Sequence, residues 1–125
     1  MFKILLVGLG GFCGAVARYF VSGFMLKVSA AFPWGTLVVN VLGSFLLGFL
    51  MTLVTETLAI SPNERLFLAI GFLGSFTTFS TFIYETNSLL EEGEFLLAGV
   101  NLFVSLLLGL FGLRLGIWLA RVLFL

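Results

Sequence analysis

The sequence contains no histidine and only one cysteine among its 125 residues. A metal site built from His and Cys ligands is therefore excluded within the chain, and so is an intramolecular disulfide. Charge is scarce too, because six Lys and Arg and six Asp and Glu make up only 10% of the chain. No basic stripe could follow a nucleic-acid backbone, so nucleic acid is not an expected partner. No general base, metal set or paired nucleophile is visible, which argues against an enzyme.

Apolar residues dominate instead, at 61% of the sequence with a mean hydropathy of +1.25. A soluble fold of this size would leave much of that surface in water. Three stretches carry no charge, namely residues 28–55, 66–84 and 95–113, with 28, 19 and 19 residues. A fourth, residues 4–26, carries only Arg18. Because a membrane-spanning helix needs about 20 apolar residues, the sequence predicts four spans.

We therefore expect an all-α membrane protein in which residues 1–125 form a single four-helix transmembrane domain. The predicted helices are Phe2–Met25, Trp34–Glu56, Glu64–Leu90 and Phe95–Leu123. Short turns join them, and the turn at residues 61–64 contains a proline suited to a helix start. No loop is long enough to hold a soluble domain.

The cations near the ends of these helices are only weakly biased to one side. Lys3, Arg65 and Arg121 fall on the side of both termini, against Lys27 on the other. This favours termini inside, but the bias is small enough to allow insertion in both orientations.

Small residues recur at near-helical spacing in the first two helices: Gly10, Gly11, Gly14 and Ala17, then Gly35, Gly43, Ser44 and Gly48. In lipid, small residues let helix backbones approach closely. We interpret most of them as packing positions.

The most unusual stretch lies in the third helix, at residues 71–82, Gly-Phe-Leu-Gly-Ser-Phe-Thr-Thr-Phe-Ser-Thr-Phe. Five hydroxyl residues, two glycines and four Phe share twelve positions. Hydroxyl side chains compete for backbone hydrogen bonds, which favours a local break in the helix. Freed carbonyls would suit a cation such as sodium, and the hydroxyls would suit an anion. Alternatively, the hydroxyls bond back within the helix and merely kink it.

Polar side chains also occur in the other predicted spans. Asn40 and Thr36 lie at i, i+4 in the second helix, and Asn101 and Ser105 do so in the fourth. The Asn40 amide either donates to an anion in a pore or bonds across a helix interface.

Four further side chains could serve either packing or function. Phe79 and Phe82 share a helix face, where ring edges could meet an anion, although such pairs usually pack. Arg18 either snorkels to the interface or faces a vestibule. For Glu85 we favour a buried hydrogen bond to the hydroxyl motif over direct contact with an ion.

These features together resemble the Fluc (CrcB) family of fluoride channels of bacteria and archaea. The matching strings are Gly35-Thr36-Leu37-Val38-Val39-Asn40 and Thr77-Thr78-Phe79-Ser80-Thr81-Phe82, with Gly71 to Gly74 before the second string and Glu85 after it, and with Gly10, Gly11, Gly14 and Arg18 in the first helix. Length and the four-span layout match as well. One departure is Ser75, where the family usually has glycine.

The resemblance implies an antiparallel, dual-topology homodimer in the plasma membrane that exports fluoride passively through two pores. It implies a structural sodium ion at the dimer interface, held by the carbonyls of Gly74 and Thr77 of each subunit at the break in the third helix. It further implies that Phe79 and Phe82 turn ring edges toward fluoride and that Asn40 is the pore amide. Ser80, Thr81 and Ser105 are candidate pore hydroxyls, and Arg18 and Glu85 are vestibule or structural residues.

Two alternatives remain. A small multidrug-type exporter, coupling protons to organic cations, needs a carboxylate in its first helix, and none is present here. A non-transporting membrane subunit would explain the glycines but leave the hydroxyl cluster without a role.

Overall fold

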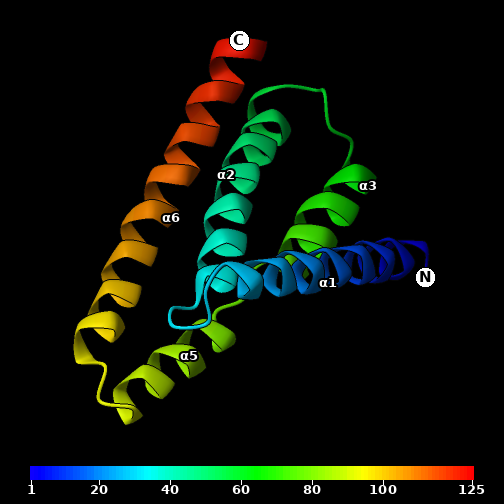
Figure 1. The fold of residues 1–125 in the computed structure, drawn as a ribbon. Coiled ribbons are helices and arrows are strands. Elements are labelled where there is room, and N and C mark those ends of the chain that lie inside the picture. Colours follow the sequence, from blue (N-terminus) through cyan, green and yellow to red (C-terminus); the bar gives the residue numbers. More distant parts are fainter.

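The computed structural model describes residues 1–125, and every regular element in it is a helix. Four segments are long and apolar enough to cross a membrane, as predicted. They are α1 (Phe2–Val28), α2 (Trp34–Glu56), a composite third span (Pro62–Glu91) and α6 (Phe95–Phe124). Figure 1 shows them with short connections between them. The first helix continues past the predicted Met25, and the Ser29 amide still donates to the Met25 carbonyl.

The third span is built from several helical pieces. It starts at Pro62, two residues before the predicted start at Glu64. It begins with α3 (Pro62–Arg65), because Ser61 is the N-cap. The Ser61 hydroxyl accepts from the Glu64 amide at 3.2 Å, and the Glu64 carboxylate accepts from the Ser61 amide at 2.7 Å. This reciprocal pair satisfies donors that a helix start leaves free.

Beyond α3 the backbone departs from α geometry. Residues Leu66–Leu73 form a π-helix, η1, followed by the short α4 (Gly74–Phe76). Thr77 is extended, with φ −88° and ψ 156°, and α5 (Ser80–Glu91) follows after Phe79. The π-helix has no counterpart in the sequence prediction.

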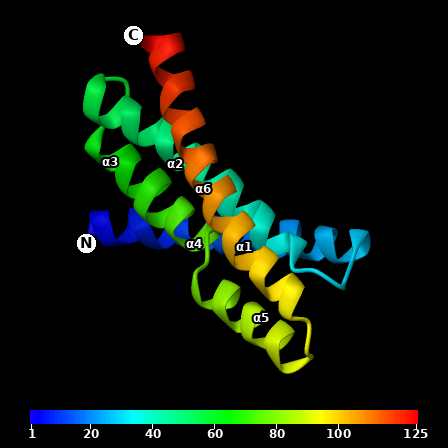
Figure 2. The same cartoon turned by 90° about the vertical axis from the view of Figure 1, so that its left-hand side faces the viewer.

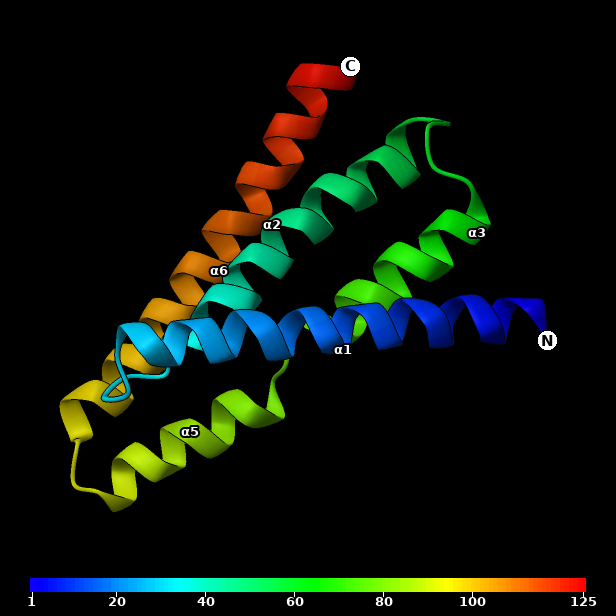
Figure 3. The ribbon, with the colours of Figure 1, turned by 45° about the vertical axis from the view of Figure 1, so that its right-hand side comes forward.

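Two close helix contacts organise the bundle, and glycines allow both. α2 and α6 run in the same direction side by side (Figure 3). A Cβ on Gly48 or Gly116 would overlap a backbone carbonyl of the other helix. α1 crosses the third span at η1, where a Cβ on Gly10 or Gly14 would overlap carbonyls of that span. The packing interpretation therefore applies to these glycines, whereas Gly8 has open space around it.

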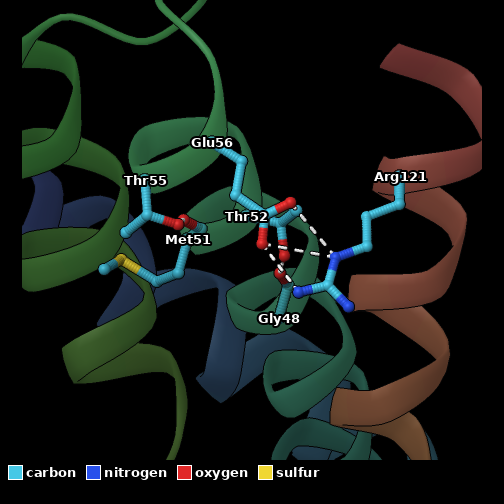
Figure 4. A network of polar contacts seen from close by, with 6 residues as sticks. All are labelled: Gly48, Met51, Thr52, Thr55, Glu56 and Arg121. Carbon is cyan, nitrogen blue, oxygen red and sulfur yellow. Dashed lines mark hydrogen bonds and ion pairs between the residues drawn. The ribbon is translucent and has the colours of Figure 1, made fainter. Parts of the chain in front are cut away.

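An ion pair joins the C-terminal ends of α2 and α6. The Glu56 carboxylate accepts from Arg121 Nη2 at 2.7 Å and from Nε at 3.1 Å (Figure 4). Nearby, the Thr52 and Thr55 hydroxyls donate to carbonyls one turn earlier in α2. Because both partners are solvent-accessible, the pair contributes little to stability.

The bundle buries few residues of its own. Only 22 of 125 residues are buried, and large apolar side chains are exposed along α1 and α6. Figure 2 shows α6 running across the front of the bundle, over α2, with α5 at the lower end. Such a surface requires lipid or another protein around it.

Candidate functional site

The hydroxyl-rich stretch contains the interruption of the third span, and α2 holds it from one side. Asn40 Nδ2 donates to the Thr78 carbonyl at 2.9 Å, and the Thr78 amide donates to Asn40 Oδ1 at 2.8 Å. The side-chain amide thus pairs both backbone groups of a non-helical residue. Of the two possibilities for Asn40, the structure contains the bond across a helix interface, and one Nδ2 hydrogen stays free for another acceptor.

α1 holds the same stretch from the other side, through Ser75. Arg18 Nε donates to the Ser75 carbonyl at 3.0 Å. The Ser75 hydroxyl donates to the Gly11 carbonyl at 2.7 Å, with a second contact to the Phe72 carbonyl at 3.2 Å. Ser75, which the sequence marked only as a departure from the family pattern, is therefore a link between two helices.

Three carbonyl groups of the interruption, those of Gly74, Phe76 and Thr77, are left without a hydrogen bond from the chain. The Thr77 hydroxyl itself donates to the Leu73 carbonyl at 2.9 Å. Of the three residues, Gly74 and Thr77 line a groove of about 340 Å³, shared with Asn40, Gly43 and Phe79. We call it the carbonyl groove. Unpaired carbonyls at bilayer depth are costly unless a cation, water or protein covers them.

A larger groove of about 1030 Å³ lies between α1, the start of α2 and α5. Arg18, Thr36, Thr81 and Glu85 line it together with residues of the loop between α1 and α2, and we call it the outer groove. Thr36 and Asn40, expected on one helix face, therefore line different grooves. The expected hydrogen bond from Glu85 to the hydroxyl motif is not formed, and Oε1 of this carboxylate is buried without a partner.

The two predicted pore phenylalanines lie side by side at the start of α5. Their ring centroids are 6.1 Å apart with an interplanar angle of 58°. Phe82 is 7% exposed, whereas Phe79 is 73% exposed and its neighbour Ser80 is exposed as well. Phe79 and Ser80 thus face away from the protomer's interior.

A chain of hydrogen bonds links α6 to α5 behind Phe82. The Ser105 hydroxyl donates to Asn101 Oδ1 at 3.3 Å, and Asn101 Nδ2 donates to the Thr86 hydroxyl at 2.8 Å. Thr86 in turn donates to the Phe82 carbonyl at 2.8 Å. Sequence reasoning missed Thr86 because it lies past the motif. The available signal was the isolated Asn101, whose amide needed a buried partner.

The predicted site residues are therefore divided within one protomer. Arg18, Thr81 and Glu85 line the outer groove, Asn40 and Phe79 line the carbonyl groove, and Ser105 belongs to the α5–α6 network. Neither groove contains all of them.

Comparison with known proteins identifies the family. Residues 5–117 match the family described as CrcB-like protein, Camphor Resistance (CrcB). A fluoride-specific ion channel FluC of Chlorobium chlorochromatii is 53% identical over 94% of this chain and 92% of its own length. Proteins of the same name from Geobacter sulfurreducens and Pyrococcus furiosus are 50% and 52% identical over 97% and 95% of the chain, and over 98% and 96% of their own lengths. The chain belongs to the CrcB family.

Proposed function

We propose that this protein is a fluoride-selective channel of the plasma membrane, through which fluoride leaves the cytoplasm by passive electrodiffusion. This export lowers the toxicity of fluoride in the cytoplasm. The observation that carries the proposal is about 50% identity, over nearly the whole chain, to proteins named fluoride-specific ion channel. The four apolar spans agree with a multi-pass membrane protein.

The chemistry of the hydroxyl-rich stretch supports an anion path. Fluoride is small and strongly hydrated, so a path must offer many short donors in place of water. The hydroxyls of Ser80 and Thr81 and the free hydrogen of Asn40 are such donors, and none carries a formal charge that would hold the ion too tightly. The Ser105 hydroxyl, which donates to Asn101 Oδ1 within the protomer, would turn toward the ion. The edges of the Phe79 and Phe82 rings are electropositive and add weak attraction.

We further propose that the working unit is an antiparallel homodimer of dual topology. Asn40 and Phe79 line the carbonyl groove, Thr81 lines the outer groove and Ser105 lines neither, so a continuous path needs residues of a second copy. The exposed Phe79 ring is available for such a contact. The weak cation bias of the loops is what insertion in both orientations requires.

The interruption in the third span is, in this proposal, the break that holds a structural sodium ion between the two copies. The unpaired carbonyls of Gly74 and Thr77 fit this ion, because uncharged backbone oxygens of unwound helices suit sodium. Each copy would contribute these two oxygens. The bound ion would supply positive charge at the interface, and the residues of this chain position the oxygens.

The proton-coupled exporter receives no support from the comparisons or from α1, which carries no acid. Efflux from liposomes containing the purified protein tests the proposal, with a fluoride electrode and a parallel chloride measurement. Rapid fluoride release without chloride release is expected. Absence of fluoride release from folded dimers would refute the channel.

Orientation is tested separately, with single cysteines at the chain ends in a Cys13→Ser background and an impermeant thiol reagent applied to intact cells. Labelling of about half of the copies is expected from dual topology. Labelling of all copies or of none would refute the antiparallel dimer and leave the fluoride assay unaffected.

A further inference from the structure

We propose that Arg18 is a positioning residue whose Nε–H takes the place of the backbone amide that the interrupted helix cannot offer to the Ser75 carbonyl. The positive charge of the guanidinium is secondary in this role. The inference rests on the proposed function, because it concerns the backbone that would hold the sodium ion.

The interruption of the helix leaves the Ser75 carbonyl without its usual backbone donor. In an unbroken α-helix the carbonyl of residue 75 accepts from the amide of residue 79. Here Thr77 is extended, and no such bond exists between Phe79 and Ser75. Arg18 Nε instead reaches the Ser75 carbonyl at 3.0 Å, in a partly buried contact between residues 57 positions apart in the chain. A buried carbonyl that loses its only donor is costly.

α1 forms two hydrogen bonds with Ser75. Besides accepting from Arg18, Ser75 donates its hydroxyl to the Gly11 carbonyl at 2.7 Å. A Cβ on Gly14 would overlap both the Ser75 hydroxyl oxygen and the Phe72 carbonyl. The close approach of α1 is therefore needed for the contact, and Arg18 lies one turn further along the same helix.

Two clamps, one from α1 and one from α2, hold the backbone next to the unpaired carbonyls that line the carbonyl groove. Ser75 is held from α1, and Thr78 is held from α2 by Asn40. The unpaired carbonyls of Gly74 and Thr77 belong to the peptide groups immediately before these two held residues. Their direction is fixed only if both clamps hold, so loosening the Arg18 contact would disperse the two oxygens.

Arg18 contacts the protein through a hydrogen-bond donor and not through its charge. Arg18 forms no ion pair, even with Glu85, which lines the same groove. Its one hydrogen bond to the protein uses Nε rather than the terminal nitrogens. An attraction of anions by charge alone would not require this atom.

Three substitutions distinguish the two roles by their covalent geometry. In Arg18→Gln the side-chain Nε2 occupies the same place along the chain as the arginine Nε, so a donor stays and the charge is lost. In Arg18→Lys a carbon takes that place and the charge stays. Arg18→Met has neither. Arg114→Gln is the matched control, because Arg114 is exposed and makes no hydrogen bond to the chain.

Two measurements follow on full-length protein in liposomes. Amide hydrogen exchange across residues 74–82 measures how often the backbone of the interruption opens. The sodium concentration for half-maximal fluoride efflux measures how well the carbonyls of Gly74 and Thr77 bind sodium. For Arg18→Met and Arg18→Lys we expect exchange to accelerate about tenfold and half-maximal sodium to rise about tenfold, the factor that one net hydrogen bond represents. Arg18→Gln and Arg114→Gln should stay within about twofold of the parent protein in both measurements.

If Arg18→Lys behaves like the parent and Arg18→Gln does not, the charge is what matters and the proposal is overturned. It is also overturned if all three variants equal the parent, or if Arg18→Gln fails together with the others. Should Arg18→Met not fold, the comparison of Gln with Lys still decides. A parent protein that does not conduct fluoride would refute the proposed function, and hydrogen exchange would still test the Arg18 contact.

Discussion

The Asn40 side chain offers the sharpest test of how the interruption is stabilised. Replacing it by alanine removes both hydrogen bonds to Thr78, at 2.8 and 2.9 Å, and leaves one amide and one carbonyl without partners. Each unpaired group costs about 1–3 kcal/mol when buried. Because Asn40 and Thr78 are only half-buried, we take about 1 kcal/mol for each group, so Asn40→Ala should destabilise the protein by about 2 kcal/mol.

The measurement is reversible denaturant unfolding of the protein in detergent micelles. Asn87→Ala is the control, since that exposed amide contacts only the Glu91 side chain, and its effect should stay within about 0.5 kcal/mol. A loss below about 0.5 kcal/mol for Asn40→Ala would show that the clamp contributes nothing.

Asn40→Asp adds a functional readout to the same position. One carboxylate oxygen still accepts from the Thr78 amide, but the other now faces the Thr78 carbonyl where a donor stood. A negative charge then lies in the proposed anion path, so fluoride efflux should be suppressed. Unchanged efflux would place Asn40 outside that path.

Three further predictions follow from burial and contacts. Phe79→Ile and Phe82→Ile should each reduce fluoride efflux, and only the buried Phe82 should also lose stability, by about 1 kcal/mol; full efflux in both variants would remove the ring-edge role. Gly14→Ala should destabilise by about 1–3 kcal/mol because its Cβ overlaps the third span, whereas Gly8→Ala, with open space around it, should be neutral or stabilising. A thermal scan showing equal effects for the two glycines would contradict the packing model. Glu56→Gln breaks the exposed ion pair to α6 and should leave the unfolding midpoint unchanged within error; a clear loss would show that the pair holds the helices together.

The four spans were predictable because their signal is strong and local. Charge-free runs of about 20 residues determine where helices cross a membrane, and α2 has the predicted bounds, Trp34 to Glu56. The start of the third span was misplaced because Ser61 and Glu64 cap each other, which placed the helix start at Pro62. The Ser-x-x-Glu pattern at residues 61–64 is typical of such a capping pair, but the interpretation of this turn did not use it.

The arrangement of the site was less predictable, because it depends on contacts between distant residues. Composition pointed to residues 71–82 but did not indicate that Thr77 would be extended or that η1 would be a π-helix. Helical spacing placed Thr36 and Asn40 on one face, yet helix crossing gives them different grooves. The partner of Arg18, 57 residues away, follows only from how α1 crosses the third span.

The glycines of α1 and the interruption of the third span belong to one feature of the molecule. Irregular backbone within a bilayer survives only where protein or water satisfies it, and short side chains can satisfy it only at close approach. Gly14 permits that approach, which brings the Ser75 hydroxyl to the Gly11 carbonyl and Arg18 to the Ser75 carbonyl. A methyl group on Gly14 would therefore push α1 away from the third span and release the Ser75 carbonyl from Arg18, which lies one turn further along α1. Packing and proposed ion chemistry should consequently fail together at this position.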